Sequence, residues 1–256
     1  MRNKDTYEAH DVVRHYATQK YLQKPEETIL NIFRDKLKPM KMLDIGVGAG
    51  RTTPYFASHV AEYVGIDCSA NMIKACEQQF RDFHKNISFK VCDVRSMKIF
   101  DNNYFDFILF SFNGLDYISH EDRLLALQQI RRVCKRGGFF CFSAHNLQSI
   151  ANLYAIRSKH PAKLLYRIFV RNPLLTVLNG RFDKIKKHGY AIIRDSSHWF
   201  RLKTYYIHPG EQVKQLDNLG FNHIRIYSLD GKEVEEVSRF ERTSANSWLY
   251  YLCRSE

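Results

Sequence analysis

One stretch, residues 42–51 with the sequence MLDIGVGAGR, constrains the fold of this chain more than any other. Its apolar first residues predict a short buried strand. The glycines that follow let the backbone turn sharply against a ligand before a helix begins near Arg51. These glycines are Gly46, Gly48 and Gly50. A strand that leads through a glycine loop into a helix is typical of a nucleotide site.

The spacing of the glycines indicates which nucleotide binds. A dinucleotide fingerprint has its third glycine three residues after the second, and Arg51 stands at that position here. A phosphate-binding P-loop ends in Gly-Lys-Ser/Thr, which is also missing. Asp44 lies two positions before the loop and favours a cationic or hydroxyl-bearing ligand over a phosphate. This stretch resembles motif I of the class I S-adenosylmethionine-dependent methyltransferases.

Two further acids follow predicted strands. Residues 61–67 predict a second strand that ends at Asp67, seventeen residues after Gly50. A carboxylate at this distance can accept hydrogen bonds from both hydroxyls of a ribose. Residues 87–92 predict a third strand, followed by Asp93 and Val94. In the family that the chain resembles, an acid at this place accepts from the adenine amino group and the next backbone N–H meets the ring.

The resemblance implies S-adenosylmethionine as the cofactor and S-adenosylhomocysteine as its product, with no metal. It also implies that the loop after the fourth strand, 104–110, borders cofactor and acceptor. Tyrosines of an N-terminal helix can close over the ligand, and Ser69 is expected to cap the next helix. The expected cofactor-binding residues are Tyr16, Tyr21, Asp44, Gly46, Gly48, Gly50, Asp67, Cys68, Met72, Asp93, Val94, Ser111 and Phe112.

The order of elements over residues 40–144 matches the family and implies an α/β fold. We expect a Rossmann-like, doubly wound sheet of seven strands, mostly parallel, with the last strand antiparallel and an insertion of helices and strands after strand five. The final hairpin is predicted at 220–228 and 247–253. Residues 121–134 predict an amphipathic helix that ends in a basic turn and a glycine stop at 135–138.

Three regions are expected. Residues 1–39 are N-terminal helices covering the cofactor site, 40–146 with 205–256 form the core, and 147–204 form a basic inserted lid. The chain has a net charge of +12, and residues 147–204 hold twelve basic residues against two acids, or +10. Within that segment, 163–170 predicts a basic amphipathic helix. A lid over the acceptor, a solvated packing helix, and a contact with a membrane surface or nucleic acid remain open as its role.

Composition narrows the remaining classes. The N-terminus lacks the apolar core of a signal peptide and no window approaches 18 uninterrupted apolar residues, so a cytoplasmic protein without a transmembrane segment is expected. Six cysteines without a C-x-x-C pair predict reduced thiols instead of disulfides or zinc.

Methyl transfer from a sulfonium needs above all an oriented acceptor, and a general base only where the acceptor must lose a proton. Candidates lie at strand ends or on the covering segment. Our hypothesis is that His198 or His145 is the base and that Asn113 and Tyr205 orient the acceptor.

The sequence therefore predicts a methyltransferase that acts on oxygen or nitrogen of a small molecule, and the basic lid favours an acidic one. A nucleic-acid methyltransferase is the first alternative, although Ser111-Phe-Asn-Gly replaces the Asn/Asp-Pro-Pro-aromatic sequence of enzymes that methylate exocyclic amines. An NAD-dependent oxidoreductase is the second alternative, and an adaptor without activity ranks below both. The oligomeric state is open.

Overall fold

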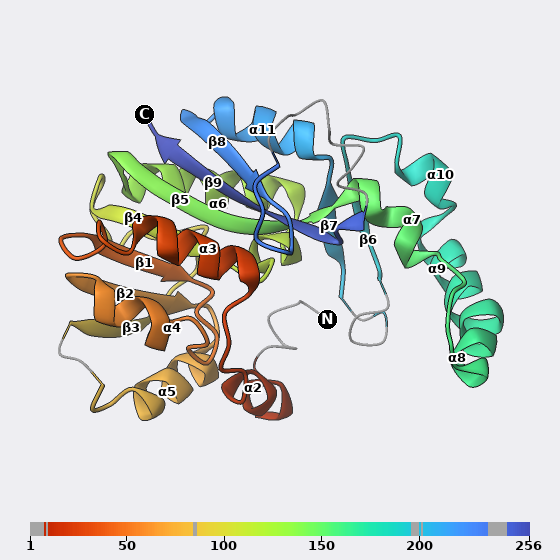
Figure 1. Cartoon of the computed structure of the whole chain (residues 1–256), viewed down its shortest axis with the longest axis horizontal. Helices are drawn as coiled ribbons and strands as arrows, with labels where there is room; N and C mark the ends of the chain where they lie inside the picture. The colour runs from red at the N-terminus through yellow and green to blue at the C-terminus, as the bar shows by residue number, and fades with distance from the viewer. Residues whose placement is uncertain (1–7, 9, 84–85, 196–199, 201, 235–244) are drawn as a thin grey trace.

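The sheet is the centre of the fold (Figure 1). The computed structural model describes residues 8, 10–83, 86–195, 200, 202–234 and 245–256. Within them, seven strands of one sheet follow the order β3-β2-β1-β4-β5-β9-β8. The neighbours from β3 to β5 are parallel, whereas β9 runs antiparallel to β5 and β8. The strands are β1 (Lys41–Ile45), β2 (Glu62–Asp67), β3 (Ile87–Val91), β4 (Phe105–Phe110), β5 (Cys134–Asn146), β8 (Phe221–Tyr227) and β9 (Trp248–Ser255). The predicted fold class is confirmed.

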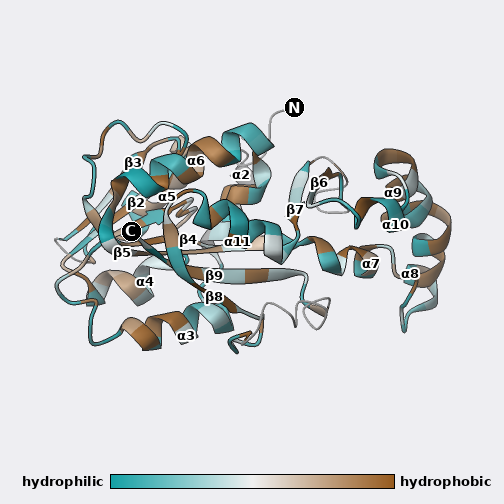
Figure 2. Cartoon of the chain, turned by 90° about the horizontal axis from the view of Figure 1, so that it is seen from above, coloured by the Kyte–Doolittle hydropathy of each residue, from teal (hydrophilic) through white to brown (hydrophobic). Residues whose placement is uncertain are grey.

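Helices cover both faces of this sheet because successive strand residues point to opposite sides. Leu43 packs with α6 (His120–Val133) and α11 (Pro209–Asp217) on one face. Met42 packs with α3 (Lys24–Phe33) and α4 (Thr53–Phe56) on the other, and Figure 2 shows the two layers. The N-terminal α2 (His10–Ala17) lies against α5 (Ala70–Gln79).

One helix cap agrees with the sequence expectation, and two helix ends differ from it. The Ser69 hydroxyl accepts from the Met72 N–H and caps α5 as expected. The helix after the glycine loop is short, since α4 passes at Ala57 into the 3-10 turn η1 (Ala57–His59). After α6, the extended backbone of Cys134 already pairs with Phe105, so residues 135–138 form an irregularity inside β5 instead of the last turn of the helix.

The chain between β5 and β8 adds a hairpin and a row of short helices. These helices are η3 (Leu147–Ser149), α7 (Ile150–Leu153), α8 (Pro161–Tyr166), the π-helical η4 (Arg167–Arg171), α9 (Asn172–Asn179) and α10 (Phe182–Ile185). We call residues 156–187 the arm, which extends away from the sheet in both views (Figures 1 and 2). None of the helices in the described ranges is long and apolar enough to span a membrane.

The hairpin of β6 (Tyr190–Ile193) and β7 (Thr204–Ile207) joins the sheet at an unusual place. β9 occupies one edge of β5 from Phe139 to His145. β7 pairs with β5 at His145 and Asn146, so it must use the other edge, the one that faces β4. Pairing with β4 stops at Phe110, and β7 therefore lies beyond the carboxyl end of β4. This is the side of an open α/β sheet where ligands bind.

Candidate functional site

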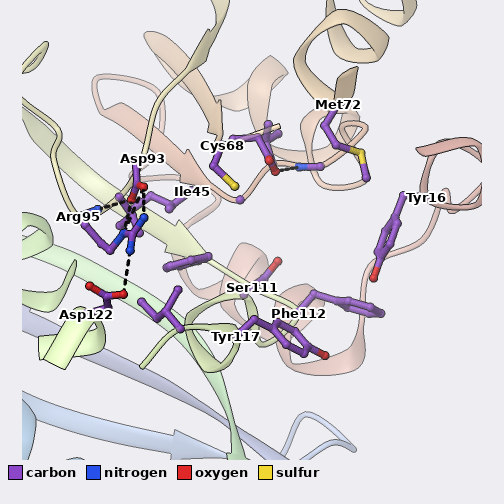
Figure 3. Close-up of a pocket in the computed structure, with 18 of the residues that line it drawn as sticks. Tyr16, Ile45, Cys68, Met72, Asp93, Arg95, Ser111, Phe112, Tyr117 and Asp122 are labelled. Carbon is purple, nitrogen blue, oxygen red and sulfur yellow. Dashed lines mark hydrogen bonds and ion pairs between the residues drawn. The ribbon is translucent and has the colours of Figure 1, made fainter. Parts of the chain in front are cut away.

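A cavity of about 1050 Å³ lies at the carboxyl ends of the parallel strands (Figure 3). One wall belongs to the sheet and its loops and contains Tyr16, Gly46, Gly48, Asp67, Cys68, Met72, Asp93, Val94, Ser111 and Phe112. Another wall comes from the inserted segment and contains Leu178, Asn179, Ile192, Arg194 and Lys203. The expected cofactor residues and the basic segment thus face the same space.

The glycine loop approaches aromatic side chains too closely for other residues. Gly46 has φ +63° and a Cβ there would lie 2.8 Å from the Phe110 ring. Gly50 has φ +86° and a Cβ there would lie 2.3 Å from the Phe80 ring. Left-handed backbone and these contacts both require glycine. Gly50 does not line the cavity, and its N–H closes the loop onto the Val47 carbonyl at 3.0 Å.

Asp67 is held in place by two backbone groups. The Gly48 N–H donates to its Oδ2 at 3.0 Å and the Ser69 N–H donates to its Oδ1 at 2.8 Å. Burial raises the pKa of Asp67, while these two N–H groups act in the opposite direction. Each carboxylate oxygen retains a lone pair for a further donor. The carboxylate lies at the cavity wall and is preorganised to accept hydroxyl groups.

Asp44 does not line the cavity but lies beneath the glycine loop. The Tyr63 hydroxyl donates to its Oδ2 at 2.6 Å, and the Thr52 hydroxyl donates to the same atom. Burial raises the pKa of Asp44 to about 6, although both hydroxyl donors favour the ionised form. In the structure Asp44 therefore connects β1 with β2 and with the start of α4.

The residues after β3 form an ionic group at one end of the cavity. Arg95 contacts Asp93 Oδ2 at 2.6 Å and Asp122 Oδ2 at 2.8 Å, and Figure 3 shows the three side chains together. The Asp93 carboxylate, predicted to accept from adenine, is thus already turned toward a guanidinium. Its partner Arg95 also lines the cavity and was missed by the sequence analysis.

A buried ion pair that the sequence analysis missed lies beside the glycine loop. Arg51 binds Glu26 of α3 through two hydrogen bonds, of 2.6 and 2.7 Å. The same guanidinium donates to the Tyr21 carbonyl at 2.9 Å and to the Ser111 hydroxyl at 3.1 Å. It also lies 4.9 Å from the centre of the Phe112 ring.

This pair explains how the N-terminal segment reaches the cavity. Tyr21 contributes its backbone carbonyl to Arg51, while its side chain is exposed and does not line the cavity. Tyr16 does line the cavity and meets Phe112 edge-to-face, with ring centroids 6.5 Å apart. In the sequence, Glu26 is already explained as the acid of a capping box with Gln23, which it does form. This local role gives no indication of its long-range partner Arg51.

The loop after β4 is strained. Phe112 and Asn113 have φ of 58° and 59°, a left-handed conformation that costs energy in residues other than glycine. The Asn113 N–H donates to the Ser143 hydroxyl at 2.7 Å. Its side-chain Oδ1 is buried and finds no hydrogen-bond donor among the residues described. Asn113 lies behind the cavity wall, directly after Phe112, which lines it.

His145 belongs to a buried charged network. Asp116 accepts from the His145 backbone N–H at 2.6 Å and lies 2.8 Å from its Nδ1. Arg123 binds the other oxygen of Asp116 at 2.6 Å. His145 does not line the cavity, but its ring meets Tyr117 edge-to-face at 6.4 Å, and Tyr117 does line it.

Of the two remaining catalytic candidates, the structure describes only Tyr205. Tyr205 is fully buried, its hydroxyl lies 2.8 Å from His120 Nδ1, and burial raises its pKa to about 12. It does not line the cavity. His198 lies outside the described residues. The structure thus gathers most of the expected cofactor residues at one cavity and leaves Asn113, His145 and Tyr205 in the layer behind it.

Comparisons with known proteins agree with this geometry. A family model described as a methyltransferase domain matches residues 42–138. A demethylmenaquinone methyltransferase from Staphylococcus saprophyticus is 26% identical over 196 residues, which are 75% of this chain and 74% of that protein.

Two solved structures have the same fold. A SAM-dependent methyltransferase from Methanosarcina mazei has a TM-score of 0.58 and 22% identity, covering 88% of this chain and 96% of its own. The 1,6-didemethyltoxoflavin-N1-methyltransferase from Burkholderia thailandensis, solved with 1,6-didemethyltoxoflavin and S-adenosylhomocysteine, has a TM-score of 0.58 and 13% identity, covering 98% of this chain and 84% of its own.

Proposed function

Since the chain belongs to the class I S-adenosylmethionine-dependent methyltransferases, with S-adenosylmethionine as its cofactor, we propose that it methylates an oxygen or nitrogen of a small molecule. One observation carries this proposal: a single cavity is lined by the glycine loop and Asp67 on one side and by the inserted segment on the other. In this proposal the cofactor and the acceptor bind side by side in the same cavity. The two named relatives, a demethylmenaquinone and a didemethyltoxoflavin methyltransferase, support a small-molecule acceptor.

The ribose and the adenine of the cofactor have proposed partners in the cavity. Asp67 accepts from the ribose hydroxyls, because its carboxylate is fixed by Gly48 and Ser69 and lies at the wall. We propose that Asp93 accepts from the adenine amino group in competition with Arg95, whose backbone N–H and guanidinium already donate to both carboxylate oxygens. The Val94 backbone meets the ring, and Tyr16 and Met72 border the opposite end (Figure 3).

The acceptor is proposed to bind against the inserted segment and to carry an anionic group. Arg194 and Lys203 are exposed basic residues of that wall. Arg194 forms no ion pair with any residue of the described ranges. Arg51 and Arg95 on the opposite wall are already paired with acids. A carboxylate or phosphate on the acceptor supplies the missing partner.

Orientation of the acceptor is expected to supply most of the rate. Holding a nucleophile against the methyl group is worth about 7 to 11 kcal/mol. We propose His145 as the base that takes the acceptor proton, because Asp116 fixes its ring beside Tyr117. His198 is the alternative base. In this proposal Asn113 and Tyr205 act from behind the wall by fixing Phe112 and the inserted hairpin.

The first test is a thermal melt of the purified protein with S-adenosylhomocysteine, with NAD, and without ligand. At a hundred times its dissociation constant a ligand adds about 2.7 kcal/mol, which raises the midpoint by roughly 5 to 10 °C. We expect this shift with S-adenosylhomocysteine only. It should vanish in Asp67→Ala and persist in Asp101→Ala, an exposed acid that does not line the cavity. A shift with NAD instead would overturn the assigned cofactor.

The acceptor is tested by screening phenols, amines and their carboxylated analogues with radiolabelled S-adenosylmethionine. We expect the carboxylated members to be the substrates. Arg194→Gln should then raise their KM about tenfold, the cost of one charge-assisted bond, with the S-adenosylhomocysteine shift unchanged. Lys214→Gln on α11 is the matched control, because Lys214 is exposed and paired with Glu211, and neither residue lines the cavity. Methylation of RNA with rejection of all small acceptors would favour the nucleic-acid alternative.

A further inference from the structure

The arm carries most of the exposed large hydrophobic side chains among the described residues. Among the described residues, sixteen large hydrophobic side chains are exposed, and nine of them lie in the arm. They include Phe169, which is 71% exposed, and Val177, which is 81% exposed. From Pro161 to Asn179 only Arg171 and Leu175 are buried. Exposed apolar side chains gathered in this way mark an interaction surface.

The arm is also strongly basic. Residues 156–187 contain nine Lys and Arg residues and one acid, Asp183, a net charge of +8. Asp183 is already paired with Arg181. Lys159, Lys163, Lys184, Lys186 and Lys187 are all exposed. The apolar surface of the arm therefore lies among positive charges that no acid of the arm neutralises.

The arm is held as a defined structure despite its exposure. Arg167 donates to the Arg157 carbonyl and Arg171 to the Leu153 carbonyl. The Asn172 side chain donates to the Tyr154 carbonyl at 2.6 Å. These hydrogen bonds hold α8, η4 and α9 against residues 153–157. The backbone of the arm is therefore fixed while its apolar side chains face solvent.

We propose that the arm is a docking surface for an anionic lipid bilayer. Such a surface accepts both features at once: apolar side chains enter the boundary between headgroups and acyl chains, and Lys and Arg contact the anionic headgroups. A second copy of the same face would bring +8 against +8. A nucleic acid would neutralise the charge but would leave the aliphatic side chains exposed. An anionic bilayer complements both.

Docking there places the cavity beside the membrane. Leu178 and Asn179 end α9 and line the cavity, and Asn179 binds the backbone of Arg194 on the neighbouring hairpin at 2.7 and 2.9 Å. The arm and the cavity wall are thus directly connected, and the acceptor can be taken from or returned to the lipid surface.

The test is co-sedimentation of the full chain with phosphatidylcholine vesicles, with and without phosphatidylglycerol. We expect binding only to the anionic vesicles, weakened by salt. The double variant Lys186→Gln with Lys187→Gln should lower the affinity about fivefold for each charge removed. Phe169→Ser with Val177→Ser should lower it about tenfold for each side chain.

Matched controls separate docking from misfolding. Val91→Ser with Ile99→Ser removes two side chains that are 55% and 56% exposed outside the arm, and it should leave binding unchanged. All variants should keep the S-adenosylhomocysteine shift, because none of these residues lines the cavity. The proposal is overturned if the wild type ignores anionic vesicles, or if the arm variants sediment like the wild type. A concentration-dependent dimer lost in Phe169→Ser would identify a second copy as the partner instead.

Discussion

Asp44 shows how a residue of the glycine motif influences stability as well as ligand binding. Burial raises its pKa from 3.8 to about 6. The folded state therefore binds a proton more tightly than the unfolded chain does. A raised pKa contributes stability that is fully present below the unfolded pKa and is lost as the pH rises through the folded value.

The first prediction concerns Asp44→Asn. An amide cannot ionise, so the variant avoids the cost of burying the charge, up to about 3 kcal/mol. The free energy of unfolding of the variant relative to wild type should rise between pH 4 and pH 7, as measured by urea titration without ligand. Exposed Asp101→Asn should show no such trend. A difference that falls with pH would contradict the assigned pKa.

The second prediction concerns His145. If it takes the acceptor proton, His145→Ala should lower kcat by about 10² to 10⁴ while the dissociation constant of S-adenosylhomocysteine stays constant. His59→Ala, in the 3-10 turn η1, is the control. Full turnover in His145→Ala would remove the residue from the mechanism.

Sequence reasoning at this scale found residues whose role is local. Gly46, Gly48 and Asp67 were identifiable because the spacing of the glycines and the position of an acid at the end of a predicted strand are visible in the sequence. Glu26 and Arg51 were not, because their pairing depends on how a distant helix approaches the loop. The sequence within a few residues of Glu26 or of Arg51 does not predict that the two side chains meet.

At the scale of elements, the pair of Glu26 and Arg51 holds four parts of the fold together. α3 provides Glu26, the glycine loop provides Arg51, the loop after β4 provides Ser111, and β9 provides Tyr250, whose hydroxyl donates to Glu26 at 2.9 Å. Both side chains of the ion pair are buried. Removal of one partner leaves an uncompensated charge, which is costly in such a place.

The third prediction follows from this burial. Glu26→Leu and Arg51→Met should each lower the free energy of unfolding by about 3 to 5 kcal/mol, and the double variant should lose less than the sum. Urea titration measures all three. Glu233→Leu, which breaks an exposed pair with Arg225, should cost less than about 1 kcal/mol. Additive losses would show that the two residues act independently.

Strands and helices were predictable where the hydrophobic periodicity and the flanking turn residues indicated the same element. The seven core strands and the antiparallel final hairpin have such signals. The start of β5 did not, because Lys135 to Gly138 has the composition of a helix end while the strand pairing of Cys134 decides its structure. The place of β7 was also not predictable, since the four residues Thr204–Ile207 do not specify which strand edge they join.

At the scale of the whole molecule, the charge is concentrated on the inserted segment, and most of it lies on the arm. With +10 of the net +12 on residues 147–204, the field attracts anions toward one end of the fold. The fourth prediction is that kcat/KM for a carboxylated acceptor falls about tenfold as ionic strength rises from about 10 mM to about 150 mM. Steady-state kinetics measure it, and an uncharged analogue of the same acceptor should show no dependence.

The position of β7 beyond the end of β4 has a consequence for engineering. The wall that the hairpin of β6 and β7 gives the cavity continues the sheet, and it is not a loop that can be exchanged freely. A chimaera that takes this region from a related enzyme must therefore receive Thr204–Ile207 together with β6, with junctions at Asn146 and His208. Junctions inside the hairpin would separate β6 from β7, which fix each other's register. The transplanted wall would then lose the strand pairing that positions it.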